Sequence, residues 1–205
     1  MSPSEPSKPL VRIYADESCL GNARGKQTPG GGAGLVELWK DGAWVRRDYW
    51  TSEPATTNNR MAIRSAIQGL RGLKQPCRVI FTSDSQYLVK GMREWIAGWV
   101  RRGWKRRSGK VENADLWKAL LPIAARHEVD WRWVRGHAGH PQNEYADHLA
   151  VRAANEQDSS KGFVESGFTE WLEEQREKYE KYFEFYEFQP PPGDEPFDPV
   201  EVPEG

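Results

Sequence analysis

The sequence predicts a mixed α/β domain built around one central sheet. Five short segments rich in β-branched and aromatic residues are typical of strands, and segments with helical spacing separate the later ones. The resulting order is three strands, a helix, a strand, helices, a strand and a helix. With 205 residues, 38% of them hydrophobic, and ten Trp, the chain has enough apolar surface for one core and an appendage.

Three predicted strands come first along the chain, before any helix. VRIYAD is the first and ends at Asp16, and a Gly-rich loop follows over residues 21–32. AGLVELW and AWVRRDYW flank Lys40-Asp41-Gly42, a sequence typical of a hairpin turn. We therefore expect the second and third strands to pair as a hairpin.

The first helix is predicted over residues 57–73. Thr56 or Thr57 is a suitable N-cap. Apolar residues recur at helical spacing through Met61, Ile63, Ala66, Ile67, Leu70 and Leu73. This pattern indicates a helix with one face in the core.

The remaining elements complete the five-stranded sheet. CRVIFTSD is a strand that ends at Asp84, and helices are expected over 86–92, 95–101 and 113–126, the last one kinked or shortened by Pro122. VDWRWV is the fifth strand. It leads into GHAGHPQNEYADHLAVRAAN, whose second half has helical spacing.

The chain divides into three parts. Residues 1–9 are polar and Pro-rich and are expected to be disordered, and residues 10–155 form the domain. Residues 156–205 form an acidic, aromatic extension, with a helix expected at about 168–188 and a disordered tail over 189–205. Three roles for the extension stay open: packing on the domain, binding a protein partner, or covering basic residues as an acidic mimic of nucleic acid.

Charge is distributed unevenly along the chain. The net charge is −1, but residues 155–205 hold 15 of the 30 acidic residues and only four of the 29 basic ones. The basic domain therefore favours a polyanionic partner. No apolar run is long enough for a membrane span and the N-terminus lacks a signal-peptide pattern, so we expect a cytoplasmic protein. In that reducing compartment we expect no disulfide between Cys19 and Cys77, and we expect a monomer.

Three acids occupy positions that suit metal binding. Asp16 and Asp84 each end an apolar strand, and Asp147 lies at the start of the last helix of the domain. Each alone is also consistent with a strand-end or helix-start charge. Together, clustered carboxylates repel one another, and a hard divalent cation such as Mg²⁺ relieves that repulsion through oxygen ligands.

Four motifs resemble type 1 ribonuclease H in order and spacing. They are DESCLGN from Asp16, TTNNRM at 56–61, SDSQYLVKGM at 83–92 and GHAGHPQNEYAD at 136–147. The resemblance covers residues 10–155. It implies a ribonuclease H-like fold with a five-stranded mixed sheet flanked by helices, and endonucleolytic hydrolysis of the RNA strand of RNA/DNA hybrids with two Mg²⁺ ions, for which Mn²⁺ can substitute.

The resemblance also implies roles for individual residues. Asp16 would bridge both metals, Asp84 would bind the metal on the nucleophile side, and Asp147 would bind the other. His137 would assist proton transfer or product release. Its alternative interpretation is a loop histidine with a structural hydrogen bond.

The sequence departs from the family at one position, because Ala62 stands where the family has its catalytic glutamate. Three explanations remain open: an engineered substitution, a relocated carboxylate, or a catalytically silent hybrid-binding protein. Glu17 is the leading replacement, and Glu37 and Glu53 are weaker ones. Since adjacent strand residues point to opposite faces, we expect Glu17 to serve only if the strand has already turned there.

Residues 93–110 resemble the basic protrusion with which the family grips the DNA strand. Cations neutralise phosphates and indole rings pack on sugars, although a Trp stripe at helical spacing also suits a core. Amide side chains suit contacts with ribose hydroxyls and the backbone. The expected substrate contacts are Asn22, Asn58, Asn59, Gln86, Trp95, Trp99, Arg101, Arg102, Trp104, Lys105 and Asn113, with Arg106 and Arg107 adding charge.

Overall fold

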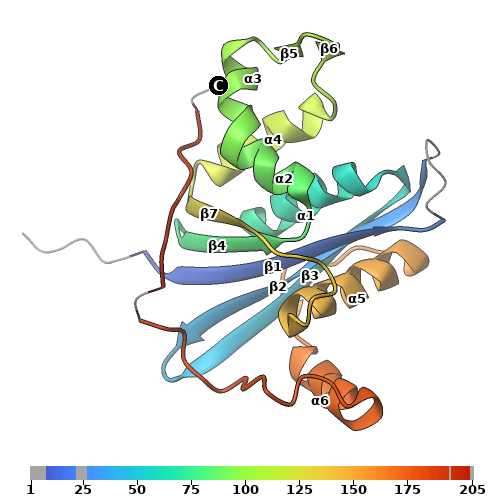
Figure 1. The fold of residues 1–205 in the computed structure, drawn as a ribbon, viewed down its shortest axis with the longest axis vertical. Helices are drawn as coiled ribbons and strands as arrows, with labels where there is room; N and C mark the ends of the chain where they lie inside the picture. Colours follow the sequence, from blue (N-terminus) through green and yellow to red (C-terminus); the bar gives the residue numbers. More distant parts are fainter. Residues whose placement is uncertain (1–7, 22–26, 194, 204–205) are drawn as a thin grey trace, which may run out of the picture.

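The computed structural model describes residues 8–21, 27–193 and 195–203. Its centre is a mixed sheet with the strand order β7-β4-β1-β2-β3-β8 (Figure 1). Strands β1, β4 and β7 run parallel, whereas β2, β3 and β8 each run antiparallel to the preceding neighbour. The strands are β1 Leu10–Cys19, β2 Thr28–Lys40, β3 Ala43–Thr56, β4 Arg78–Ser83, β7 Glu128–Trp133 and β8 Val164–Glu165.

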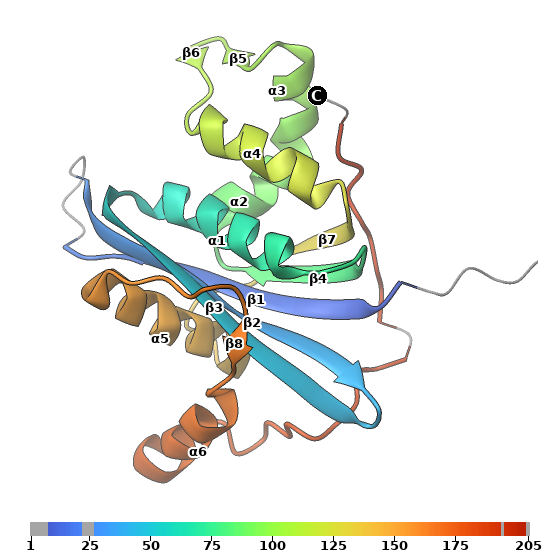
Figure 2. The same cartoon turned by 180° about the vertical axis from the view of Figure 1, so that it is seen from behind.

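Helices cover both faces of this sheet (Figures 1 and 2). On one face α1, α2 and α4 enclose a large apolar cluster that includes Ile13, Phe81 and Trp117. On the other face α5 and α6 enclose a smaller cluster around Leu35 and Phe168. The helices are α1 Asn58–Gly72, α2 Gln86–Lys90, the π-helical turn η1 Gly91–Trp95, α3 Ile96–Arg101, α4 Ala114–Ala124, α5 Pro141–Glu156 and α6 Phe168–Tyr179.

The predicted α/β fold is confirmed, with differences in the extent of several elements. Strand β1 continues past Asp16 to Cys19, and β2 begins inside the segment expected to be a loop, because residues 17–19 pair with 30–32. Gly31 permits close packing there, since a Cβ on it would lie 2.2 Å from the carbonyl oxygen of Ala150 in α5. Thr57 caps α1 as expected, by accepting a hydrogen bond from the Arg60 N–H.

Two helical predictions also change. The helices expected at 86–92 and 95–101 form one continuous helical segment, because η1 bridges the gap between α2 and α3. Helix α4 ends at Ala124 with Pro122 in its last turn. Beyond α3, a short hairpin of β5 (Lys105–Arg106) and β6 (Gly109–Lys110) forms the tip of the protrusion.

The extension adds a sixth strand to the five that were expected. β8 pairs with Arg47 and Asp48 on the otherwise free edge of β3. Asp48 is buried, and its carboxylate accepts hydrogen bonds from the Tyr145 hydroxyl (2.6 Å), the Ser166 hydroxyl (2.7 Å) and the Gly167 N–H (3.1 Å). A buried acid therefore anchors the start of the extension on the domain.

Helix α6 is shorter than the helix expected over about 168–188. It ends at Tyr179, because Glu180 adopts a left-handed conformation with φ 54°. The tail over 189–205 was expected to be disordered, but residues 189–193 and 195–203 lie against the domain (Figures 1 and 2). Glu195 pairs with Arg12 and Arg132 on the α5 face of the sheet, and the Val200 N–H donates to the Val129 carbonyl of β7 (3.0 Å).

Candidate active site

The two strand-end aspartates lie side by side at one edge of the sheet. Parallel strands β1 and β4 are in register at Ala15 and Ser83, so Asp16 and Asp84 are the next residue on each. Asp16 is buried, with 6% of its surface exposed, and Asp84 is half-buried. Asp147 comes from α5, which packs on β1 and β2. The three predicted acids therefore come from three elements that pack together.

Glu17 joins this group although β1 does not turn at that residue. Its cross-strand partner is Gly32, and a Cβ on Gly32 would meet the Met61 carbonyl oxygen of α1 at 2.8 Å. Cross-strand partners share a face, so Glu17 lies on the α1 face while Asp16 lies on the α5 face. Because the pairing of β1 with β4 ends at Ala15, both side chains reach the space beyond the end of β4.

Ala62 lies on the same face of the sheet as Glu17. It belongs to α1, is 1% exposed and is part of the larger apolar cluster. The face that lacks a carboxylate on α1 thus has one on β1. The turn in the strand that we expected at Glu17 is not present, and the carboxylates of Asp16 and Glu17 meet instead where the β1–β4 pairing ends.

The carboxylate oxygens form a group able to hold a metal ion. One oxygen from each of Asp16, Glu17 and Asp84 lies within 4.8 Å of the others. Glu17 Oε2 is buried, and no hydrogen-bond partner for it exists among the described residues. A buried, unpartnered carboxylate oxygen beside two further carboxylates fits a hard divalent cation.

Burial raises the pKa of the carboxyl groups at Asp16, Glu17, Asp84 and Asp147. Burial, together with the charges of Asp84 and Asp147, raises the pKa of Asp16 to about 8. Burial and the charges of Asp16 and Asp84 raise the pKa of Glu17 well above its usual value. Burial also raises the pKa of Asp84 and of Asp147, although the charge of His137 acts to lower both. A bound cation would offset the mutual repulsion of these carboxylates and favour their ionised forms.

Several side chains that the sequence analysis missed hold these acids in place. The Asn143 amide donates to Asp16 Oδ2 (3.0 Å), and the Trp133 indole N–H donates to the backbone carbonyl of Asp84 (2.9 Å). At Gly136 a Cβ would lie 2.3 Å from Asp84 Oδ2, so this glycine makes room for the carboxylate. Asn143 and Gly136 both lie inside the GHAGHPQNEYAD motif, so the motif was the feature of the sequence from which their roles could have been predicted.

His137 lies on the exposed loop between β7 and α5, in a left-handed conformation with φ 51°. A positive charge on His137 acts to lower the pKa of both Asp84 and Asp147. The weaker carboxylate candidates lie in ion pairs instead. Glu37 pairs with Arg46 (2.7 Å), and Glu53 pairs with Arg64 (2.9 Å).

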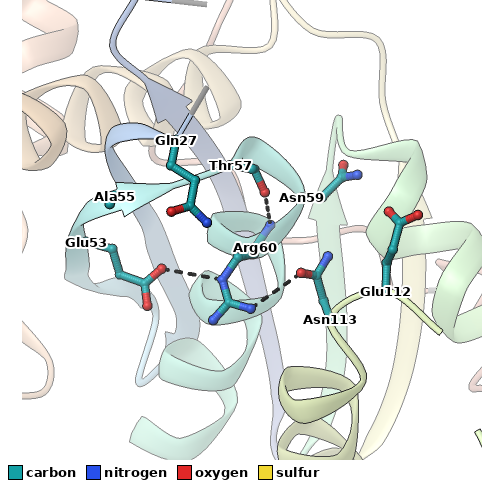
Figure 3. A pocket seen from close by; sticks show the side chains of 8 residues that line it. All are labelled: Gln27, Glu53, Ala55, Thr57, Asn59, Arg60, Glu112 and Asn113. Atoms are coloured by element: carbon teal, nitrogen blue, oxygen red, sulfur yellow. Dashed lines mark hydrogen bonds and ion pairs between the residues drawn. The ribbon is translucent and has the colours of Figure 1, made fainter. Parts of the chain in front are cut away.

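A pocket of about 490 Å³ lies at the N-terminus of α1 (Figure 3). Arg60 stands at its centre, within 3.8 Å of Glu53 and donating to the Asn113 side-chain oxygen at 3.4 Å. Asn113 in turn donates to the Tyr87 hydroxyl at 3.2 Å. The pocket is lined by Gln27, Glu53, Ala55, Thr57, Asn59, Arg60, Glu112 and Asn113, so it holds two of the predicted substrate contacts.

The predicted protrusion residues separate into packed aromatics and exposed cations. The Trp99 ring lies 5.7 Å from Trp95 and 5.6 Å from Trp117, and Trp104 packs on the larger apolar cluster. Arg101, Arg102, Lys105, Arg106 and Arg107 are exposed, as are Asn58 and Gln86. Asn22 lies outside the described residues. The tryptophans therefore build the base of the protrusion, and its cations form its surface.

Comparisons with other proteins agree with this architecture. The family model described as RNase H matches residues 8–155. The chain is 49% identical to a ribonuclease H of Pseudomonas entomophila over 71% of this chain and 94% of that one. It is 50% identical to a ribonuclease HI of Caulobacter vibrioides over 72% and 96%.

Solved structures similar to this chain include ribonucleases H as well. A crystal structure described as LC9-RNase H1, a type 1 RNase H with the type 2 active-site motif, is 54% identical and covers 82% of this chain and 83% of its own, with a TM-score of 0.78. The solution structure of the PFV RNase H domain is 16% identical with a TM-score of 0.61, a likeness of fold alone. The chain belongs to the ribonuclease H family.

Proposed function

We propose that this chain cleaves the RNA strand of RNA/DNA hybrids endonucleolytically, with Glu17 as the carboxylate that replaces the one absent at Ala62. The observation that carries the proposal is the grouping of Glu17 with Asp16 and Asp84, and the buried, unpartnered oxygen of Glu17. Retention of four acids would have no structural benefit in a purely binding protein, because their raised pKa values reflect an unfavourable arrangement.

A relative supports a changed carboxylate set. LC9-RNase H1 is 54% identical and is described as carrying the type 2 active-site motif on a type 1 protein. A rearranged motif therefore occurs in a protein of this fold and similarity. This favours a natural relocation over an engineered or degenerate site at Ala62.

Asp16, Glu17, Asp84 and Asp147 would hold two Mg²⁺ ions, for which Mn²⁺ can substitute. Divalent cations in such a site supply water activation and stabilisation of charge on the leaving oxygen. Asn143 fixes the orientation of Asp16, and Trp133 fixes the backbone of Asp84. His137, exposed beside Asp84 and Asp147, would assist proton transfer or product release.

The hybrid would lie across the pocket beside Arg60 and the exposed cations of the protrusion. Asn59 and Asn113 line that pocket with neutral donors and acceptors, which suit a sugar-phosphate backbone without sequence preference. Arg101, Arg102 and Lys105 are exposed and would contact phosphates of the DNA strand. Trp95, Trp99 and Trp104 would support these contacts by packing beneath them.

The test is cleavage of an end-labelled RNA/DNA hybrid in Mg²⁺ and in Mn²⁺ by the chain and four variants. We expect the unaltered chain to cleave, and Glu17→Gln and Asp84→Asn to lose at least about 100-fold in rate, the upper end of the loss typical for residues that only support a metal ligand. Glu156→Gln, an exposed acid at the end of α5, is the matched control and should cleave normally. Calorimetric titration with Mg²⁺ should show weaker binding to Glu17→Gln than to the unaltered chain. Glu156→Gln should bind Mg²⁺ as the unaltered chain does.

The fourth variant, Ala62→Glu, separates the alternatives. Cleavage by the unaltered chain that survives Glu17→Gln would exclude Glu17 as a ligand. Hybrid binding without cleavage, with activity appearing only in Ala62→Glu, would identify a catalytically silent hybrid-binding protein. Cleavage that requires Glu17 and does not need Ala62→Glu supports the proposal.

A further inference from the structure

The Tyr182 side chain links the C-terminal extension to the loop that carries His137. The Tyr182 hydroxyl donates a hydrogen bond to Glu144 Oε2 in the first turn of α5. The other carboxylate oxygen, Glu144 Oε1, accepts a hydrogen bond of 3.1 Å from the Gly139 N–H. Gly139 follows His137 by two residues, so one carboxylate joins the extension to this loop.

Packing fixes Tyr182 on the domain. Its ring lies 5.8 Å from that of Trp171 in α6 and packs on the smaller apolar cluster. Its backbone adopts φ 59°, a left-handed conformation that aromatic residues seldom adopt, and its carbonyl accepts a hydrogen bond from the Phe185 N–H (3.0 Å). An unfavourable backbone conformation persists only where the surroundings hold it, so the direction of the phenol is set by the fold.

The loop over residues 137–140 is exposed and contains two left-handed residues, His137 (φ 51°) and Gly139 (φ 85°). The Glu144 N–H donates to the His140 carbonyl (3.0 Å), which fixes the start of α5. The bond from Gly139 to the Glu144 carboxylate therefore links the loop to a rigid helix.

We propose that Tyr182 is a positioning residue for His137. Its hydroxyl holds Glu144 in the rotamer that captures the Gly139 N–H, and the captured loop limits where the imidazole can lie relative to Asp84 and Asp147. The inference rests on the proposed function, since it assigns a use to the histidine of that site. It gives the extension a role in the reaction through contact with the catalytic loop and without contact with substrate.

The first experiment compares Tyr182→Phe, which removes only the hydroxyl, with Tyr186→Phe, at a residue on the same segment that is 66% exposed. We expect Tyr182→Phe to lower kcat about 3- to 10-fold with KM within twofold, and Tyr186→Phe to leave both unchanged. Thermal unfolding of both variants checks that neither loses the fold.

A double-mutant cycle tests the route of the effect. In a His137→Ala background, Tyr182→Phe should have no further effect on kcat, because the residue that it positions is gone. Glu144→Ala removes both hydrogen bonds and should lower kcat at least as much as Tyr182→Phe, with no additional loss in the double variant. An equal loss from Tyr182→Phe with and without His137 would overturn the proposal.

A second measurement is independent of cleavage. Amide exchange at Gly139 and the imidazole resonances of histidine-labelled protein are followed by NMR without metal. Tyr182→Phe should accelerate Gly139 exchange about 5-fold and shift the His137 signals, whereas Tyr186→Phe should do neither. Unchanged exchange and signals would overturn the proposal even if kcat falls. If the unaltered chain cleaves no hybrid, the proposed function fails, while these measurements still decide whether Tyr182 positions the loop.

Discussion

The Trp133 indole N–H donates a hydrogen bond of 2.9 Å to the backbone carbonyl oxygen of Asp84. Trp133 ends β7, and Asp84 follows the end of the neighbouring parallel strand β4. The register pairs Ser83 with Trp133, so the indole spans the two strands at the edge where the carboxylates gather. An exposed tryptophan, 47% accessible, therefore fixes the backbone of a candidate metal ligand.

Replacing Trp133 should weaken metal binding. In Trp133→Phe the Asp84 carbonyl loses its donor, and the carboxylate gains freedom that metal binding must remove. We expect an approximately 10-fold weaker affinity for Mg²⁺ by calorimetric titration. Trp44→Phe is the matched control, because the Trp44 indole also donates to a backbone carbonyl, that of Gln189 (2.9 Å), far along the chain from the acids. Equal affinities in the two variants would contradict the role given to Trp133.

The stability of the metal-free protein should fall as the pH rises toward 9. The pKa of Asp16 is raised to about 8 in the folded state, so the folded protein binds its proton more tightly than the unfolded chain does. The resulting stabilisation is complete below about pH 4 and is lost as the pH rises through about 8. Asp16→Asn, which never ionises, should therefore lose at least about 1.4 kcal/mol less between pH 5 and pH 9, the equivalent of one pKa unit.

The comparison uses urea unfolding in a chelator at both pH values. Asp41→Asn in the β2–β3 turn is the control and should follow the unaltered chain, since Asp41 is exposed and asparagine tolerates its left-handed φ of 53°. Mg²⁺ should restore the stability of the unaltered chain at pH 9. Parallel pH profiles for Asp16→Asn and the unaltered chain would contradict the raised pKa.

Neutralising Glu53 should tighten hybrid binding. Glu53 lies 2.9 Å from Arg64 and 3.8 Å from Arg60, so it offsets positive charge beside the pocket of Figure 3. In Glu53→Gln these arginines attract phosphates more strongly, and we expect Kd to fall about 2- to 5-fold at low salt and to converge with the unaltered value at high salt. Fluorescence anisotropy in the Asp84→Asn background measures Kd without cleavage. A Kd that rises, or a change that Glu156→Gln reproduces, would contradict a phosphate site there.

Removing residues 195–205 should destabilise the domain and leave hybrid affinity unchanged. Glu195 pairs with Arg132 (2.6 Å) and with Arg12, and Val200 and Val202 pack on the larger apolar cluster, so we expect a loss of about 1–3 kcal/mol. Truncation also frees Arg93 from its ion pair with Asp198, but Arg101, Arg102 and Lys105 take no part in the ion pairs of the tail, so Kd should stay within twofold at low salt. Binding several-fold tighter after truncation would instead support the tail as an acidic mimic of nucleic acid.

The sequence predicted the domain fold because its strands and its first helix have clear periodicity. Thr57 caps α1 as expected, and Asp84 follows the end of its strand, whereas β1 continues past Asp16 to Cys19. The extent of β1 was missed because pairing with the glycines of β2 gives no hydrophobic signal. The position of the Glu17 side chain depends on where the pairing of β1 with β4 stops. The sequence of either strand by itself does not reveal that end point.

The contacts of the extension were harder to foresee. Tyr182 and Glu144 are 38 residues apart, and their meeting follows from a left-handed turn after Tyr179 that no glycine marks. The high content of proline and acidic residues predicted a disordered tail. In the structure its acidic residues pair with three arginines of the domain, Arg12, Arg93 and Arg132. Order in such a segment comes from the surface that receives it, and composition alone does not reveal that surface.

The extension touches both outer strands of the sheet, β3 through β8 and β7 through Val200. Unpaired strand edges are sites where separate molecules join strand to strand. A fragment ending near residue 155, the boundary that the family match suggests, would leave both edges bare. We therefore expect such a fragment to self-associate and precipitate at concentrations where the whole chain remains dispersed, which would make the extension a protection of the sheet edges against aggregation.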